Sequence, residues 1–356
     1  TLTYIRRARI FKDNARERTY LDMAEKSALA CGNDGAVAEI MMLRLEHLAT
    51  YSDMEQFCRY ADVVRGYMAE RKDRRGANVE YLVIKRHVDE GLTQTALQTA
   101  RKMLSDATVK NDTYRQAYAY YSIGLIYQAV AQYGESVDAL ERCVRMMEGT
   151  MKDFPRLDCI KAQLELLSSQ YALGRNQESL ETCMAASRNL DEFIADTDSD
   201  FQMGVNCMSM RLYIECYAAR NYMALHDMAK ARGHLHTAAG LIYPSIGLDR
   251  ETYNETYAMY CSRTGNYETA LKYADMSVAA FRTAGLAPYY TEALELKKAI
   301  LADMGSWKEA YQSQELVENV RDSLKASRFA SELNELRTIY ELDKMEAQKK
   351  RQQVVI

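Results

Sequence analysis

The chain has 356 residues, of which 46 are Lys or Arg and 50 are Asp or Glu, so its formal net charge is −4. This balance argues against the basic surface of a nucleic-acid-binding protein, and 48% hydrophobic residues argue against a disordered chain. Only 3 Pro and 16 Gly are present, too few turn-forming residues for a sheet protein of this length, so the composition predicts an all-α fold.

The N-terminal segment predicts a frayed helical hairpin over residues 1–31. Residues 1–12 would be the remains of its first helix. Residues 15–31 form the second, with an apolar face through Leu21, Ala24 and Ala28. The segment does not begin with Met and lacks the apolar core of a signal peptide. No run of 18 apolar residues follows, so we expect any membrane attachment only through sequence beyond Ile356.

A repeat pattern is clearest in the middle of the chain. Tyr120, Gly124 and Tyr127 are followed by a short turn, Tyr133, and small or apolar residues at positions 136, 140 and 143. This order resembles the tetratricopeptide repeat, a hairpin of two helices. The glycine and the small residues let the two helices approach closely, and the larger apolar side chains fill the gap to the next hairpin.

The turn followed by a small or apolar anchor residue recurs along the whole chain. The anchors are Phe57, Ala96, Ser136, Ser179, Ala231, Ala270 and Ala310. They are spaced by 39, 40, 43, 52, 39 and 40 residues, longer than the roughly 34 of the standard repeat, so helices or loops are extended. The 52-residue step contains Asp191–Asp200, the expected insertion. We therefore predict an α-solenoid, a superhelix of about seven hairpins, over residues 1–322.

The last segment, residues 323–356, is predicted to be a connector helix, because no Gly or Pro occurs from Trp307 onward. Leu333, Leu336, Tyr340 and Ala347 form an apolar seam. Two interpretations remain open: the seam packs on the end of the array, or it forms a parallel coiled coil and hence a homodimer.

The sequence contains no motif typical of catalysis, phosphate binding or metal binding, so we expect no enzyme activity, no metal and no cofactor. His234 and His236 would point apart on a regular helix and could not chelate one ion. Asp196–Asp200 resembles the start of a calcium loop, but Phe201 and Cys207 occupy the positions that require Gly and a carboxylate.

Eight cysteines are distributed along the chain. They are Cys31, Cys58, Cys143, Cys159, Cys183, Cys207, Cys216 and Cys261. None forms a CxxC pair, and most lie where a helical pattern needs a small apolar residue, so we expect buried free thiols. A disulfide or a reactive thiol is the alternative.

Tyrosine supplies 26 of the 34 aromatic residues. Some tyrosines, with a few polar residues, fall at first-helix positions that face the concave groove of this architecture. The groove candidates are Tyr81, Lys85, Tyr118, Tyr121, Gln128, Lys161, Tyr171, Tyr213, Tyr217 and Arg220. Because Tyr and Arg are favoured interface anchors, the groove is predicted to bind a protein or peptide. The alternative is that these side chains fill the inside of a tightly wound superhelix. The Lys/Asn set that clamps a C-terminal carboxylate in chaperone-binding members is not reproduced, so we do not expect that role.

The ending of the chain carries a second resemblance. Lys308–Tyr311, Val320–Leu324 and Glu332–Glu341 follow the array in an order similar to the sensor regions of tetratricopeptide-bearing histidine kinases and helix-turn-helix regulators of Bacteroides-type bacteria. This resemblance implies a periplasmic, membrane-tethered array in a two-component signal-transduction protein.

In such proteins the connector passes through a basic stretch into one membrane helix and on to an output domain. Lys349–Arg351 and Val354–Ile356 match that approach to the membrane. The alternative function is a soluble cytoplasmic scaffold that assembles other proteins through the same groove, and the free cysteines fit that compartment.

Overall fold

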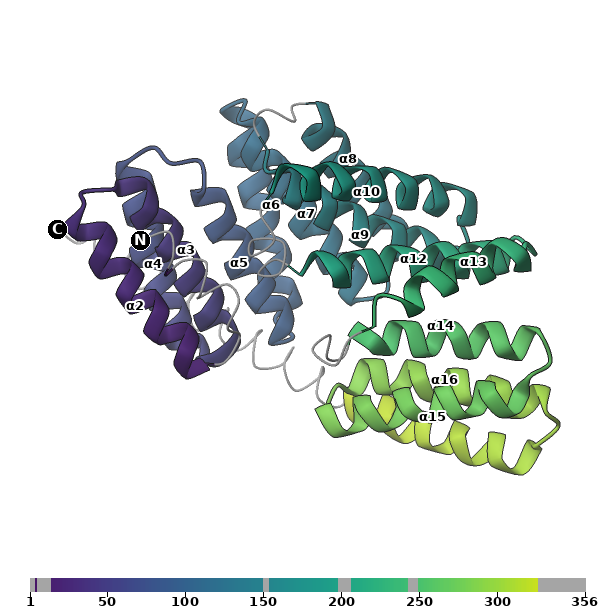
Figure 1. Cartoon of the computed structure of the whole chain (residues 1–356). Coiled ribbons are helices and arrows are strands. Elements are labelled where there is room, and N and C mark those ends of the chain that lie inside the picture. The colour runs from purple at the N-terminus through teal and green to yellow at the C-terminus, as the bar shows by residue number, and fades with distance from the viewer. Residues whose placement is uncertain (1–3, 5–13, 150–153, 198–205, 243–248, 326–356) are drawn as a thin grey trace. The chain divides into compact units, whose positions relative to one another are not determined.

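A computed structural model describes residues 4, 14–149, 154–197, 206–242 and 249–325 of the chain. Within these ranges the regular structure is entirely α-helical, with no β-strand, so the predicted all-α fold is confirmed (Figure 1). The helices are α2 (Asn14–Ala30), α3 (Asp34–Tyr51), α4 (Met54–Glu70), α5 (Gly76–Asp89), α6 (Thr93–Val109), α7 (Thr113–Ala129), α8 (Tyr133–Gly149), α9 (Arg156–Ala172), α10 (Asn176–Asp196), α12 (Cys207–Ala224), α13 (Met228–Ala239), α14 (Asp249–Arg263), α15 (Tyr267–Ala284) and α16 (Ala287–Asp303). Residues 307–325 are also helical.

Two predicted segments fall mostly outside the described residues. They are the first helix of the frayed hairpin, residues 1–12, and the connector, of which only residues 323–325 are described. The homodimer predicted for the connector stays a prediction.

Consecutive helices pack as pairs, and the pairs pack on one another. α7 contacts α8, α9 contacts α10, and α12 contacts α13. Contacts between α8 and α9 and between α10 and α12 join these pairs (Figure 1). First helices also touch directly, since α9 contacts both α7 and α12. This arrangement is a helical repeat fold, in which each pair buries its apolar face against its neighbours.

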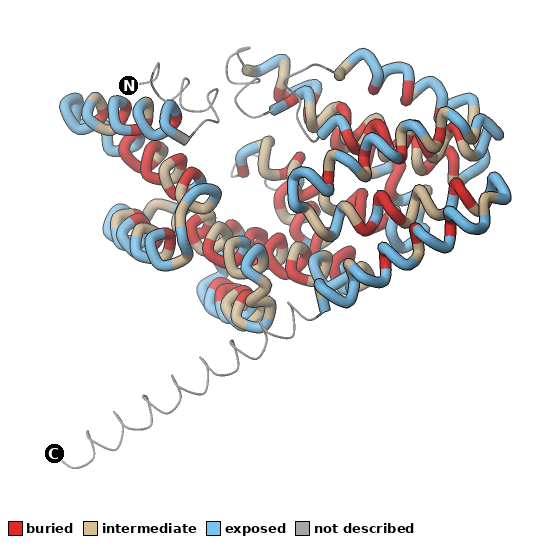
Figure 2. Tube along the Cα trace, turned by 90° about the horizontal axis from the view of Figure 1, so that it is seen from below, coloured by how far each residue is buried: buried red, intermediate tan, exposed pale blue. Residues whose placement is uncertain are grey.

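The anchor residues explain why the two helices of each pair pack closely against each other. All seven lie near the start of the second helix of a pair, and none is more than 7% exposed. Gly124 in α7 lies so close to α8 that a Cβ atom there would be 2.5 Å from Cγ of Leu140. Figure 2 shows the result, with buried positions where helices pack on one another and exposed positions on their outer sides. In first helices such as α3 and α7, buried positions surround most of the helix.

The turns within the pairs repeat one backbone feature. A residue with positive φ closes most of them, as at Gly91 (φ 78°), Gly174 (φ 73°) and Gly265 (φ 79°). Glycine adopts this conformation without steric cost, which is why the sequence pattern marks these turns. The 52-residue step is explained in part by α10, whose 21 residues make it the longest of the described helices.

The chain divides into two compact units. The first comprises residues 1–86 and 99–256, and the second residues 87–98 and 257–356. Buried residues of the first unit include Leu45 and Phe57 near its start and Leu167 further along. In the second unit, Cys261 and Ile300 belong to a smaller core. All ten groove candidates belong to the first unit.

Candidate functional site

The groove candidates come from the first helices of four successive pairs. Tyr81 and Lys85 lie on α5, Tyr118, Tyr121 and Gln128 on α7, Lys161 and Tyr171 on α9, and Tyr213, Tyr217 and Arg220 on α12. We call the six tyrosines of this set the tyrosine strip.

The α5 and α7 members of the tyrosine strip pack on each other. The rings of Tyr81 and Tyr121 stack with centroids 5.1 Å apart, and the ring of Tyr118 lies 6.2 Å from that of Tyr81. Tyr118 is 2% exposed and Tyr121 5%, so neither offers appreciable surface to a partner. Their contacts correspond to the alternative in which tyrosines fill the space between first helices.

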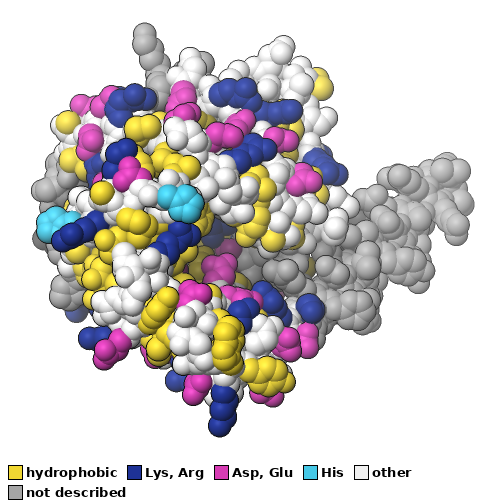
Figure 3. Space-filling view, turned by 90° about the vertical axis from the view of Figure 1, so that its right-hand side faces the viewer, with side chains coloured by type: hydrophobic (Ala, Val, Ile, Leu, Met, Phe, Trp, Pro, Cys, Tyr) yellow, Lys and Arg dark blue, Asp and Glu magenta, His cyan; other side chains and the backbone are white. Residues whose placement is uncertain are grey.

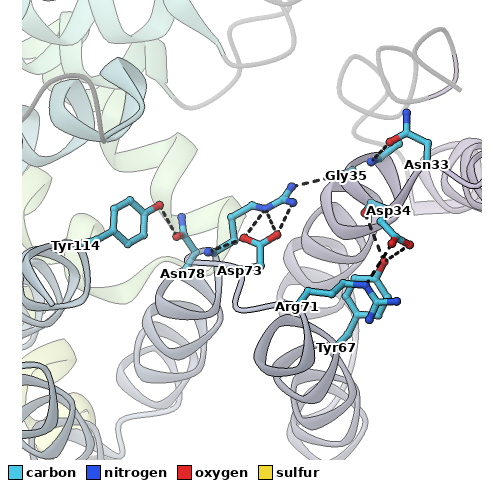
Figure 4. A network of polar contacts seen from close by, with 10 residues as sticks. Asn33, Asp34, Gly35, Tyr67, Arg71, Asp73, Asn78 and Tyr114 are labelled. Carbon is cyan, nitrogen blue, oxygen red and sulfur yellow. Dashed lines mark hydrogen bonds and ion pairs between the residues drawn. The ribbon is translucent and has the colours of Figure 1, made fainter. Parts of the chain in front are cut away.

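The hydroxyl of Tyr118 links three pairs. It donates a hydrogen bond to the carboxylate of Asp158 on α9 and accepts one from Nδ2 of Asn78 on α5, at 2.9 Å. Oδ1 of Asn78 in turn accepts from the Tyr114 hydroxyl at 3.0 Å (Figure 4). Lys161 lies beside Asp158, with its Nζ 3.9 Å from Oδ1, and its side chain is 44% exposed.

The remaining members of the strip form a second cluster. Tyr213 and Tyr217 lie 4.5 Å apart, and the edge of one ring of the Tyr171–Tyr217 pair meets the face of the other at 5.6 Å. The Arg220 guanidinium lies 5.0 Å from the Tyr217 ring centre and donates from Nε to Thr256 Oγ1 at 2.8 Å.

Arg220 also pairs with Glu255 at 3.2 Å, and its side chain is only 11% exposed. Its pKa is raised: burial alone would lower it, and the surrounding tyrosines and Glu255 more than offset that. Arg220 therefore lies mostly buried and links α12 to α14 through these contacts.

Glu165 on α9 is the member of this site that sequence reasoning missed. The Gln128 amide and the positive charge of Lys85 both favour the ionised form of its carboxylate and so act to lower its pKa. Burial is the main cause that raises the pKa values of Tyr81, Tyr121 and Tyr213. The negative charge of Glu165 is a smaller cause that acts in the same direction on all three. Groups from α5, α7 and α12 thus converge on one carboxylate.

Burial also raises the pKa of Glu165 itself and outweighs both effects, because a carboxylate that is half-buried is harder to ionise than one in open water. One sequence signal could have identified this residue. Lys85 and Glu165 are separated by 80 residues, twice the length of one repeat, so they occupy the same register of their helices.

Gln128 ties α7 to α9. Its Nε2 donates to Ser168 Oγ at 2.9 Å and lies 3.3 Å from Ser169 Oγ. Among the ten candidates, Lys85 is exposed, and Tyr81, Gln128, Lys161, Tyr171, Tyr213, Tyr217 and Arg220 are intermediate. The role of the set in binding stays a prediction.

Metal-binding groups do not assemble in the part of the chain that the structure describes: no cluster of three or more His, Cys, Asp or Glu is present there. His234 is paired with Glu215 at 2.7 Å and stacks on Tyr222. Asp196 pairs with Arg156 at 2.9 Å, and the rest of the calcium-like segment, residues 198–200, lies outside the described residues.

The eight cysteines are all free, and six of them are buried. Burial raises the pKa values of Cys159, Cys183 and Cys216 to about 12, so these thiols stay protonated near neutral pH and are poor nucleophiles.

The surface and the helices supply two further observations. Basic and acidic side chains are interspersed on the face shown in Figure 3 and are not separated into patches of one sign. Among the described helices, none is both long and apolar enough to cross a membrane.

No protein-family model matches the sequence, and no curated protein matches it. Solved structures do match. A chain of the APC/C hetero-tetramer Cut9–Hcn1 has a TM-score of 0.50 and 11% identity, over 89% of this chain and 53% of that chain, so the present chain spans about half its length.

Two smaller proteins are similar over most of their own length. The apo form of RapI has a TM-score of 0.48 and 15% identity, over 77% of this chain and 93% of that chain. Kinesin light chain TPR-like repeats from Podosopora anserina have a TM-score of 0.38 and 14% identity, over 70% and 96%. At such identities the similarity concerns the fold alone, which is an all-α helical repeat.

Proposed function

We propose that this chain is a non-enzymatic module that binds a protein or peptide through the first-helix face of α5, α7, α9 and α12. The observation that carries the proposal is the convergence on Glu165. Holding a carboxylate among tyrosine rings costs folding free energy, and an apolar side chain would fill the same place without that cost. A perturbed carboxylate surrounded by polar and aromatic groups is a reason to expect a binding role.

Lys85 and Lys161 are the members of the set best placed to meet a partner. Lys85 is exposed, and the Lys161 side chain is 44% exposed. Together with Glu165 they offer charges of both signs beside aromatic edges, which suits a peptide that carries both acidic and basic groups. Arg220 is a poor position for testing binding, because charge reversal there would put a second negative charge beside Glu255 and destabilise the fold.

Site-specific photo-crosslinking in cells that express the full-length protein tests the proposal. A photoreactive residue replaces Lys85 or Lys161 in turn. Matched controls carry it at Val63 on α4 or Val109 on α6, which are 59% and 81% exposed on second helices. We expect one discrete adduct at both lysine positions, weakened by Glu165→Gln. Equal adducts at the valine positions, or none at either lysine, would reject the first-helix face.

We further propose that binding is signalled to an output domain, as in a periplasmic, membrane-tethered sensor. The support is the resemblance of residues 308–344 to the ends of such sensor arrays. Binding that favours one curvature of a helical array could change the geometry of a connector helix that follows it. The test is the coding sequence after Ile356: about 20 apolar residues are expected there, and their absence would remove this part of the proposal.

A second candidate function is a soluble cytoplasmic scaffold with the same binding face. The eight free cysteines favour it, because thiols persist unpaired more readily in a reducing compartment. Fusions of the full-length protein to alkaline phosphatase, which is active outside the cytoplasm, and to a fluorescent protein that folds inside it, distinguish the two candidates.

A further inference from the structure

The last described helix, residues 307–325, carries two large aromatic side chains in the open. Trp307 is 70% exposed and Tyr311 72%, and a spacing of four residues puts them on the same side of the helix. We call this surface the terminal aromatic face. Soluble proteins rarely leave contiguous apolar surface bare, because its contact with water is unfavourable. The face belongs to the second compact unit, whereas the ten groove candidates all belong to the first.

The corresponding positions of the earlier pairs are covered. Trp307 lies three residues before its anchor, Ala310, and Tyr311 lies one residue after it. Of the residues one position after an earlier anchor, only Arg232 is exposed, and Val137 is fully buried. The residues three positions before an earlier anchor are all intermediate in exposure: Met54, Thr93, Tyr133, Asn176, Met228 and Tyr267. Among the described pairs, only the last leaves both positions exposed.

The first helix of the following pair provides the cover. Leu180, one position after its anchor on α10, belongs to the same buried cluster as Ile214 of α12. In the second unit, Leu271 of α15 and Leu296 of α16 pack against the core that contains Ile300 of α16. In each case the covering helix is the next first helix along the chain. The terminal aromatic face therefore has the position on which one more first helix would pack.

The sequence provides suitable side chains at the expected distance. The last two anchors are 40 residues apart, so a first helix equivalent to α16 would span residues 327–343. Leu296 and Ile300 belong to the core that α15 and α16 share. Shifted by 40 residues, they become Leu336 and Tyr340, two members of the apolar seam.

The polar residues of the segment also fall where a terminal helix needs them. Leu294 and Leu301 lie on a different side of α16 from Leu296 and are only 2% and 4% exposed. Shifted by 40 residues, they become Asn334 and Glu341, which are polar. Terminal repeats of such arrays have a polar outer face, because no further helix covers it. Residues 327–343 therefore carry the pattern of a helix that closes the array.

We propose that residues 327–343 pack on the terminal aromatic face as a last first helix, with the apolar seam toward Trp307 and Tyr311. The segment follows the described helix directly, so it loses less translational freedom on packing than a separate partner would. The seam is then covered within one chain and does not form a coiled coil with a second copy. This contact lies in the second unit and does not depend on the binding proposed for the first.

The fluorescence of the whole chain tests the proposal, because Trp307 is its only tryptophan. Acrylamide quenching should be severalfold weaker than for N-acetyltryptophanamide, with emission at shorter wavelength. The variant Leu333→Glu/Leu336→Glu places two charges in the seam and should make Trp307 severalfold easier to quench. The matched control, Ser331→Glu/Thr338→Glu, adds the same charges on the opposite side of the proposed helix and should leave quenching unchanged.

Two results on the unsubstituted chain would overturn the proposal without relying on any variant. One is quenching of Trp307 as strong as that of N-acetyltryptophanamide, which would show that nothing covers the face. The other is protection that disappears on dilution as sedimentation changes from dimer to monomer, because a second copy would then provide the cover. Equal quenching of the seam variant and its control, at unchanged helix content by circular dichroism, would also overturn it.

Discussion

Gly124 illustrates how a single residue sets the distance between two helices. Replacing it with Ala would place Cβ 2.5 Å from Cγ of Leu140, a side chain with no exposure. Relieving that overlap should cost about 1–3 kcal/mol, more than the gain in helix propensity of up to about 1 kcal/mol. We therefore expect Gly124→Ala to lower the free energy of unfolding measured with urea.

Gly66 in α4 provides the matched control. It is exposed, and a Cβ atom there would meet nothing within 4 Å. Gly66→Ala should raise stability by about 0.5–1 kcal/mol through helix propensity alone. Equal effects of the two substitutions would contradict the close approach of α7 and α8.

Asp73 makes one contribution to stability dependent on pH. Its carboxylate accepts from Nε of Arg75 at 3.0 Å and from the Arg75 backbone N–H at 2.9 Å, and Nη1 of Arg75 reaches the Gly35 carbonyl at 3.4 Å (Figure 4). These hydrogen bonds hold the pKa of Asp73 below its ordinary value of 3.8. The stabilisation is therefore complete above that value and is lost as the pH falls through the lowered pKa.

We expect Asp73→Asn to destabilise the protein by about 1 kcal/mol at pH 7 and progressively less below pH 3.8. Unfolding curves at several pH values measure this difference. Asp62→Asn is the control, since that carboxylate is 71% exposed and its removal should change little at any pH. A cost at Asp73 that does not vary with pH would exclude the ionic explanation.

At the scale of helices, Tyr118 connects α5, α7 and α9 through one hydroxyl. Tyr118→Phe keeps the ring but leaves Asp158 without its donor and Nδ2 of Asn78 without its acceptor. We expect a loss of about 1–3 kcal/mol in the free energy of unfolding. Tyr311→Phe, at a side chain that is 72% exposed, should have almost no effect.

A double-mutant cycle of Tyr118→Phe with Asp158→Asn isolates the interaction between helices. A coupling energy near zero would show that the hydroxyl does not join α7 to α9.

At the scale of the whole molecule, stability in a repeat array is a sum of pairs and of the contacts between neighbours. α9 packs against α7, α8, α10 and α12, so opening it breaks contacts on several sides. In the helix at residues 307–325, Trp307 is 70% exposed and Tyr311 72%. We expect hydrogen exchange to be slowest in α7–α9 and fastest in residues 307–325. Uniform protection would indicate one cooperative unit instead.

The repeat register could be predicted because it depends on local chemistry. A turn residue such as Gly265 and a small anchor such as Ala270 are needed wherever two helices must close, and both recur at nearly constant spacing. The site was only partly predictable. The sequence indicated which tyrosines share a helix face, but it did not indicate that Tyr121 is buried or that Arg220 is paired with Glu255.

The sequence by itself therefore determined that the chain is all-helical, that its helices pair, and where each pair begins, because turn chemistry and helix periodicity act over a few residues. Only the tertiary structure decided that groups from three other helices act on Glu165. The reason is that this site joins residues from different repeats, and the stacking of one pair on the next sets their separation.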